Sequence, residues 1–203
     1  MTPLEIPSHI EALIFDIDGT LVDTMPTHYK ACQLACKKYG FDFPLEFFIS
    51  NAGRPTLAVF EDLIKEKKIN LDGRQLGIEK EIILESLIEE FTPMPIIADT
   101  ALHYFNKLPM ALGTGGTKLI ATKTVDIVNL ASYFDVVVTA DDVEHYKPHP
   151  ETFLKCAEQM GISPEKCLVF EDGEPGIQAA ISAGMEYLDI RKIVGEPNYS
   201  EFI

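Results

Sequence analysis

The sequence predicts an α/β protein with a doubly wound, parallel sheet of five strands and an inserted all-helical segment. Five short apolar runs alternate with segments of helical periodicity, which favours parallel strands joined by right-handed crossovers. Polar and acidic residues follow the ends of these runs, whereas residues 25–92 show helical periodicity without strands. We therefore expect a core domain of residues 1–24 and 93–203 and a cap domain of residues 25–92.

The first strand is predicted over residues 12–15, where four consecutive apolar residues stop at Asp16 and Asp18. A run without polar alternation indicates a strand buried on both faces. Carboxylates at the end of such a strand have little water around them, so they require a cation, protonation of one member, or both.

Three kinds of site contain two aspartates separated by one residue. They are a calcium loop, a phosphoacceptor pocket like that of receiver domains, and a phosphotransfer enzyme with an aspartate nucleophile. The calcium loop is excluded because its sixth and twelfth positions require glycine and glutamate. Those positions hold Leu21 and Thr27. The rest of the chain must distinguish the two kinds of site that are left.

The cap is predicted as four helices. Asp23 or Thr24 can cap the first, Pro44 to Ser50 forms a short second, and Asp72 caps the fourth. Lys80 lies on the apolar stripe of the fourth helix, so we expect its side chain to point inward. Residues 92–95 interrupt the helical pattern and are expected to be a connector between the cap and the core.

Beyond the connector, helices and strands alternate. The expected strands cover residues 110–113, 134–139, 167–170 and about 187–190. The first helix of this part is expected to bury Ala98, Leu102, Phe105 and Leu108, and the second to bury Ile120, Ile127, Val128 and Ala131.

Chemically distinctive residues follow four of the five strands. Thr114 follows the second strand, Lys147 comes after the third, and Glu171 and Asp172 follow the fourth. Because the carboxyl ends of parallel strands share one edge, we expect these residues to meet Asp16 and Asp18 in one crevice. Oxygen ligands without a cluster of histidines and cysteines favour Mg²⁺ over zinc. Such acidic ligands beside a lysine and a threonine are suited to phosphoryl transfer.

Composition limits the partners that the chain can have. The 203 residues include 17 basic and 32 acidic side chains, a net charge of −15 that disfavours nucleic acid and anionic lipid. Residues 1–10 indicate neither a signal peptide nor a membrane span, so we expect a cytoplasmic protein. Its four cysteines are expected to be buried thiols. We expect a small phosphate ester as the ligand and a monomer or a weak homo-oligomer.

The motifs taken together resemble the haloacid dehalogenase superfamily. Asp16-x-Asp18-Gly19-Thr20, then Thr114, then Lys147-Pro148, and then Glu171-Asp172 match its four motifs in order and spacing. The helical insertion after the first motif resembles the β-phosphoglucomutase-like branch, and within it the sugar phosphatases acting on fructose 1-phosphate or 6-phosphogluconate. The resemblance implies a Rossmann-like sheet and a Mg²⁺-dependent phosphoric monoester hydrolase.

The resemblance also implies roles. Asp16 would be the nucleophile that forms an aspartyl phosphate, and Asp18 the general acid and base. Thr114 and Lys147 would hold the phosphoryl group. The expected metal ligands are Asp16, the backbone carbonyl of Asp18, Asp172 and, in the outer shell, Glu171. The expected substrate contacts are Thr24, His28, Asn51, Arg54, Lys80 and Gly115.

A β-phosphoglucomutase is a second function that the motifs allow. However, mutases have an arginine three residues after the cap glycine, and the residue three after Gly53 is Thr56. Past the second motif, mutases have serine, lysine and asparagine where this chain has Gly116, Thr117 and Lys118. Arg54 and Lys118 are near enough in sequence to substitute. Two further candidates are a receiver-like phosphoacceptor and a sugar-phosphate binder without catalysis.

Overall fold

The computed structural model describes residues 2–195, 197 and 199 and is built on a five-stranded parallel sheet. The strands are β1 (Ala12–Phe15), β4 (Met110–Gly113), β5 (Val136–Val138), β6 (Cys167–Glu171) and β7 (Glu186–Asp189). Their order is β5-β4-β1-β6-β7, with parallel pairing throughout. This confirms the predicted doubly wound fold. The chain runs outward from β1 in both directions, so the topological switch point lies between β1 and β6.

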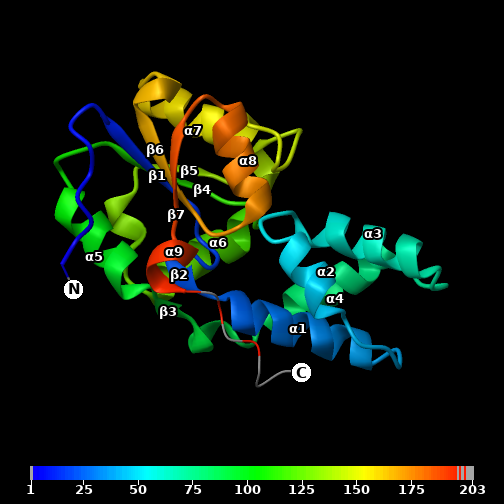
Figure 1. The fold of residues 1–203 in the computed structure, drawn as a ribbon. Helices are drawn as coiled ribbons and strands as arrows, with labels where there is room; N and C mark the ends of the chain where they lie inside the picture. Colours follow the sequence, from blue (N-terminus) through cyan, green and yellow to red (C-terminus); the bar gives the residue numbers. More distant parts are fainter. Residues whose placement is uncertain (1, 196, 198, 200–203) are drawn as a thin grey trace.

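Helices cover both faces of this sheet (Figure 1). They are α5 (Pro95–Tyr104) and α6 (Lys118–Ile127) on one face, and α7 (Glu151–Met160) and α8 (Glu174–Ser182) on the other. Side chains of β1 alternate between the two: Leu13 and Phe15 join the α5 and α6 cluster, whereas Ala12 and Ile14 join the α7 and α8 cluster. Burying one large apolar side chain contributes about 1.5–3 kcal/mol, which explains the uninterrupted apolar run.

Four helices form a separate group beside the sheet (Figure 1). They are α1 (Met25–Lys37), α2 (Leu45–Ser50), α3 (Thr56–Lys67) and α4 (Gly73–Glu85). Their own apolar cluster contains Tyr29, Phe43 and Phe60. As predicted, the Asp72 carboxylate caps α4 by accepting hydrogen bonds from the amides of residues 74 and 75. We call these four helices the cap; its predicted boundaries at residues 25 and 92 stay a prediction.

The predicted connector pairs with the other end of the insertion. β2 (Val22–Asp23) and β3 (Thr92–Pro93) form a two-stranded antiparallel ribbon at the base of the cap. Proline is tolerated there because this short strand is an edge strand. The two chain segments that join the sheet to the cap are therefore hydrogen-bonded to each other, a pairing that the sequence did not predict.

Two predicted helix faces also need correction. Leu102 of α5 is 42% exposed, Phe105 is 38% exposed, and Ile127 of α6 is 44% exposed. α5 buries Ile97 and Ala101 beside the expected Ala98, so its buried face does not include Leu102. Phe105 lies beyond the helix, which ends at Tyr104. Apolar side chains on surface helices are common, so periodicity alone misplaced the buried face.

The remaining described elements are short. They are η1 (Ile88–Glu90), η2 (Ala131–Tyr133), η3 (Ala140–Asp142), η4 (Pro164–Lys166) and α9 (Arg191–Val194). After α9 the chain returns to the cap, where the Tyr199 ring meets the edges of Tyr29 and Phe48 at centroid distances of 5.7 and 5.8 Å. No helix in the described part of the chain is long and apolar enough to cross a membrane.

Candidate active site

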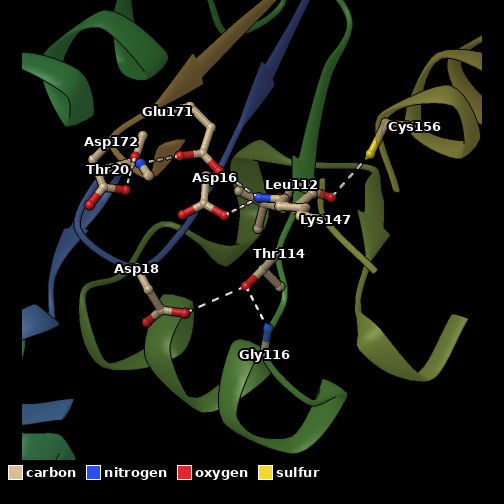
Figure 2. A network of polar contacts seen from close by, with 12 residues as sticks. Asp16, Asp18, Thr20, Leu112, Thr114, Gly116, Lys147, Cys156, Glu171 and Asp172 are labelled. Carbon is tan, nitrogen blue, oxygen red and sulfur yellow. Dashed lines mark hydrogen bonds and ion pairs between the residues drawn. The ribbon is translucent and has the colours of Figure 1, made fainter. Parts of the chain in front are cut away.

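Lys147 and Asp16 form the buried centre of the candidate site (Figure 2). Asp16 directly follows β1, and its amide donates to the carbonyl of Phe170 in β6, which fixes the backbone at the switch point. The ammonium of Lys147 donates to the Asp16 carboxylate at 2.6 Å, to the Glu171 carboxylate at 2.8 Å and to the carbonyl of Gly113 at 3.0 Å. All three ammonium hydrogens therefore have acceptors, which is what keeps a buried lysine charged.

Three carboxylates meet beside this lysine. One oxygen from each of Asp16, Glu171 and Asp172 lies within 4.8 Å of the others. Thr20 donates to Asp172 at 3.1 Å, and the amide of Gly173 donates to Glu171 at 2.6 Å. These hydrogen bonds orient two of the three carboxylates at the edge of the sheet (Figure 2).

The glycine at position 176 makes room for this arrangement. A side chain there would overlap the carboxylate of Glu171, so only a glycine allows the first turn of α8 to pass so close.

The charges of this cluster are unbalanced. Three buried carboxylates face the one ammonium of Lys147. Burial, opposed by Lys147 and assisted by Glu171, raises the pKa of Asp16 to about 8. Burial together with Glu171 and Asp16 raises the pKa of Asp172 well above its usual range. An oxygen-only donor set that is costly to ionise fits a hard divalent cation.

Asp18, two residues after Asp16, faces the cap rather than the acidic cluster. Its carboxylate accepts a hydrogen bond from Thr24 at 2.8 Å and lies 3.2 Å from the imidazole Nε2 of His28. The Thr114 hydroxyl is 3.5 Å away, which is too long for a strong hydrogen bond. Burial acts to raise the pKa of Asp18, but His28, Thr24 and Lys80 outweigh it and lower the pKa to about 2.

The buried Lys80 of the cap completes this second network. As predicted, its side chain points inward, and its ammonium donates to His28 Nδ1 at 3.1 Å, to Thr56 at 3.2 Å and to Glu81 at 3.0 Å. An ammonium can only donate, so Nδ1 of His28 accepts and the imidazole proton lies on Nε2, which is 3.2 Å from the Asp18 carboxylate but makes no well-aligned hydrogen bond. Asp18 of the core is thus connected through His28 to Lys80 of the cap.

A cavity separates the acidic cluster from the cap helices. Its polar lining comprises Asp16, Asp18, Thr114, Gly115, His28, Asn51, Arg54, Thr56, Lys80 and Glu81, and its apolar lining includes Phe43, Phe48 and Phe60. Asn51 and Arg54 lie at its edge with partners of their own. Asn51 donates to the carbonyl of Phe47, Arg54 donates to the Asn51 side-chain carbonyl, and the same guanidinium pairs with Asp62 at 2.8 Å.

Sequence reasoning missed several residues of this site. Thr20, which orients Asp172, belongs to the first motif but carries no charge. Thr56 and Glu81 were not predicted as site residues, although Glu81 directly follows Lys80 in the sequence. The lining by Phe43, Phe48 and Phe60 could not be read from periodicity, because the same residues also form the cap's apolar cluster.

The cap loop of residues 51–54 touches the core at the cavity. A side chain at Gly115 would overlap the carbonyl oxygen of Gly53, and one at Gly53 would approach Lys147 and Glu171 to 3.7 and 3.8 Å. The loop therefore reaches the polar centre and shields it from solvent.

A family profile matches this chain from residue 10 to residue 184, which includes every core residue of the site. The chain is a haloacid dehalogenase-like hydrolase. One relative of this hydrolase is the fructose-1-phosphate phosphatase YqaB of Escherichia coli, strain K12. It is 42% identical over 180 residues, which cover 88% of this chain and 95% of that protein. A phosphorylated carbohydrates phosphatase of Thermotoga maritima is 32% identical over 183 residues, covering 87% and 83%.

Solved structures agree with the fold of the hydrolase. A β-phosphoglucomutase from Clostridium difficile superposes with a TM-score of 0.79 at 25% identity, covering 96% of this chain and 93% of that one. CbbY from Rhodobacter sphaeroides, solved with phosphate, superposes with a TM-score of 0.78 at 22% identity, covering 88% and 84%. The predicted resemblance to the β-phosphoglucomutase-like branch is confirmed.

Proposed function

We propose that this hydrolase removes phosphate from a small sugar phosphate through an aspartyl-phosphate intermediate. The observation that carries the proposal is the pairing of two networks across one cavity. Asp16, Lys147, Glu171 and Asp172 form an anionic centre that suits a cation and a phosphoryl group. Asp18, two residues after Asp16, belongs to a separate network that includes the cap and lines the same cavity. The two phosphatase relatives support this proposal.

Asp16 is the proposed nucleophile. Its carboxylate is fixed at the end of β1 by Lys147, so one oxygen can attack phosphorus while the leaving oxygen departs on the opposite side. The resulting acyl phosphate is then hydrolysed, which divides one difficult displacement into two steps. Lys147 and Thr114 are the proposed phosphoryl contacts, because the Thr114 hydroxyl has only a long contact to Asp18 as donor and remains available.

Asp18 is the proposed general acid and base. With a pKa of about 2 it is a carboxylate in the resting protein, ready to accept a proton from the attacking water. In the first step it must carry a proton to the leaving oxygen, and it takes up that proton from water or from the phosphate ester beforehand. Against the effect of burial, His28, Thr24 and Lys80 lower the pKa of Asp18, so these residues favour the carboxylate that the second step needs.

Mg²⁺ is the proposed cofactor, with Asp16, Asp172 and the backbone carbonyl of Asp18 as ligands and Glu171 in the outer shell. The raised pKa values of Asp16 and Asp172 support this assignment, because a bound cation lets both carboxylates ionise together. When bound, the ion offsets repulsion between the nucleophile and the phosphate. Glu171 is also held by Lys147 and the amide of Gly173, which suits an orienting role.

The sugar end is proposed to lie against the cap. Thr24 and His28 contact Asp18, and Lys80 contacts His28. His28 and Lys80 line the cavity together with Asn51, Arg54 and Gly115, whereas Thr24 is not among the lining residues. The aromatic lining is broad and apolar, which suits the carbon skeleton of a hexose or ketose phosphate. The fructose-1-phosphate phosphatase relative supports a ketose phosphate.

A β-phosphoglucomutase is the second candidate, favoured by the likeness to the Clostridium difficile enzyme. A mutase must hold a second phosphate, which calls for a free cationic fork in the cap. Here the guanidinium of Arg54 is occupied by Asn51 and Asp62. Lys118 is exposed and absent from the residues that line the described cavity. Neither residue supports a second phosphate site, so we favour the hydrolase.

The deciding assay supplies β-glucose 1-phosphate with a trace of the 1,6-bisphosphate and follows glucose 6-phosphate and inorganic phosphate together. A hydrolase releases phosphate faster than it forms glucose 6-phosphate, and the reverse would establish the mutase. A panel of sugar phosphates, fructose 1-phosphate first, then ranks the substrates by kcat/KM. A receiver-like phosphoacceptor or a non-catalytic binder would give no multiple-turnover release with any of them.

The cytoplasmic location and the monomeric or weakly oligomeric state stay predictions from the sequence.

A further inference from the structure

A second group of metal-ligating side chains lies outside the candidate active site. His145 and His149 are exposed on the loop after η3, and Glu151 is the first residue of α7. One ring nitrogen of each histidine and one carboxylate oxygen of Glu151 lie within 4.8 Å of one another. The proposed phosphatase mechanism uses none of these three side chains.

The three side chains are already arranged around a common point. His145 Nδ1 is 3.1 Å from Glu151 Oε2, and the two imidazole rings lie with centroids 4.6 Å apart and planes at 32°. Two imidazoles and a carboxylate around one point are a ligand set found in three-ligand zinc sites, where water fills the fourth position.

Glu151 is held in place by the backbone. Its carboxylate accepts hydrogen bonds from the amides of Glu144 at 3.0 Å and His145 at 2.9 Å, and Lys155 approaches at 2.9 Å. One ligand is therefore oriented before a cation arrives, which reduces the entropy lost on binding.

We propose that His145, His149 and Glu151 bind one divalent cation of the class that prefers imidazole ligands, such as Zn²⁺. The donor set separates this site from the acidic cluster, because three carboxylates favour Mg²⁺ whereas two imidazoles favour Zn²⁺, Ni²⁺ or Cu²⁺.

The position of this site links it to the candidate active site. Lys147 lies in the chain between the two histidines, and its side chain points the other way, into the buried centre. A cation bound to residues 145, 149 and 151 would restrict the conformation of the segment 145–151, which contains Lys147. The hydrogen bonds of Lys147 go to Asp16, Gly113 and Glu171 and not to either histidine, so binding can be tested without removing a residue of the candidate active site.

The test is a calorimetric Zn²⁺ titration of the full chain, freed of any affinity tag, in excess Mg²⁺. We expect the wild type to bind one equivalent more than either His145→Ala or His149→Ala. His9→Ala is the matched control, because His9 is an exposed histidine 2.6 Å from Glu186, a pair without a second imidazole. This control should keep the full stoichiometry.

A second readout uses Co²⁺ in place of Zn²⁺. The wild type and His9→Ala should show the same visible absorption for a site of low coordination number, and His149→Ala should lose it. Equal stoichiometry and equal spectra for wild type and both loop variants would overturn the proposal. An equal loss in His9→Ala would overturn it too, since binding would then be general to surface histidines. Circular dichroism of each variant verifies that these exposed substitutions leave the fold unchanged.

Discussion

Gly115 of the core and the carbonyl oxygen of Gly53 in the cap loop are in such close contact that a methyl group at position 115 would overlap that oxygen. The contact sets how near the cap loop comes to Lys147 and Glu171. We predict that Gly115→Ala folds normally but lowers kcat/KM for sugar phosphates by roughly 100-fold, because the cap can no longer reach its position. Steady-state kinetics on the purified variant give the measurement.

Gly116→Ala is the matched control for this prediction. A side chain at position 116 meets the Thr114 hydroxyl at 3.4 Å and the Asp18 carboxylate at 3.6 Å, and none of its nearest atoms belongs to the cap loop. Its loss of kcat/KM should therefore be smaller than that of Gly115→Ala. Equal losses in the two variants would mean that the loop tolerates no side chain for reasons unrelated to the cap.

Asp16→Asn should fold and lose activity. The amide keeps the shape of the carboxylate but cannot attack phosphorus, and Lys147 keeps Glu171 as a partner. We expect kcat to fall by roughly 1,000-fold or more, as for the loss of other covalent nucleophiles. Asp126→Asn, an exposed aspartate of α6, is the control. Turnover within about tenfold of wild type would remove Asp16 from the nucleophile role.

Asp18→Asn should damage the enzyme in a way that depends on the leaving group. General acid catalysis contributes roughly 100- to 10,000-fold where the departing alcohol needs a proton. The formation of the aspartyl phosphate should therefore slow greatly with a sugar phosphate and less with an aryl phosphate, whose phenolate leaves unaided. Single-turnover measurements with both substrates isolate this step. An equal loss for the two would contradict the acid role.

Removal of divalent cations should abolish turnover and leave the fold intact. Both apolar clusters of the sheet exist without the acidic centre, unlike a small zinc module that unfolds when its metal is removed. Phosphate release should stop in a chelator and return with Mg²⁺, while circular dichroism stays the same. A spectrum that collapses on chelation would show that the cation supports the fold.

Stability of the metal-free protein should fall as the pH rises. The pKa of Asp16 is raised from 3.8 to about 8, chiefly by burial, so the folded protein holds this proton more tightly than the unfolded chain. The resulting stabilisation is complete below 3.8 and is lost as the pH rises through about 8. Asp172 acts in the same direction.

Thermal unfolding in a chelator at about pH 6 and at about pH 8.5 tests this linkage. The melting temperature should be lower at the higher pH, and Mg²⁺ should raise it more there, because its ligands bind as carboxylates. Asp16→Asn should show a smaller fall. A melting temperature that rises with pH in the chelator would contradict the sign of the shift.

The sequence by itself determined the sheet and the core half of the site. The apolar runs at residues 12–15 and 167–170 predict strands buried on both faces, and Asp16 and Glu171 follow these runs directly. Parallel strands place their carboxyl ends on one edge, so Asp16, Thr114 and Glu171 were expected to be neighbours, with Lys147 in the loop after the strand at that edge.

Only the tertiary structure decided how these residues divide into two networks. Asp16 and Asp18 are two residues apart, yet one faces Lys147 and the other faces Thr24 and His28, since the chain turns away from the sheet between them.

The partners of Lys80, the ribbon of β2 and β3, and the packing of Tyr199 on the cap were likewise beyond the sequence. Periodicity reports which face of a single helix is apolar, whereas these contacts depend on the relative placement of segments far apart in the chain. That placement is set by close packing of side chains from distant segments, and no local sequence pattern reports such packing.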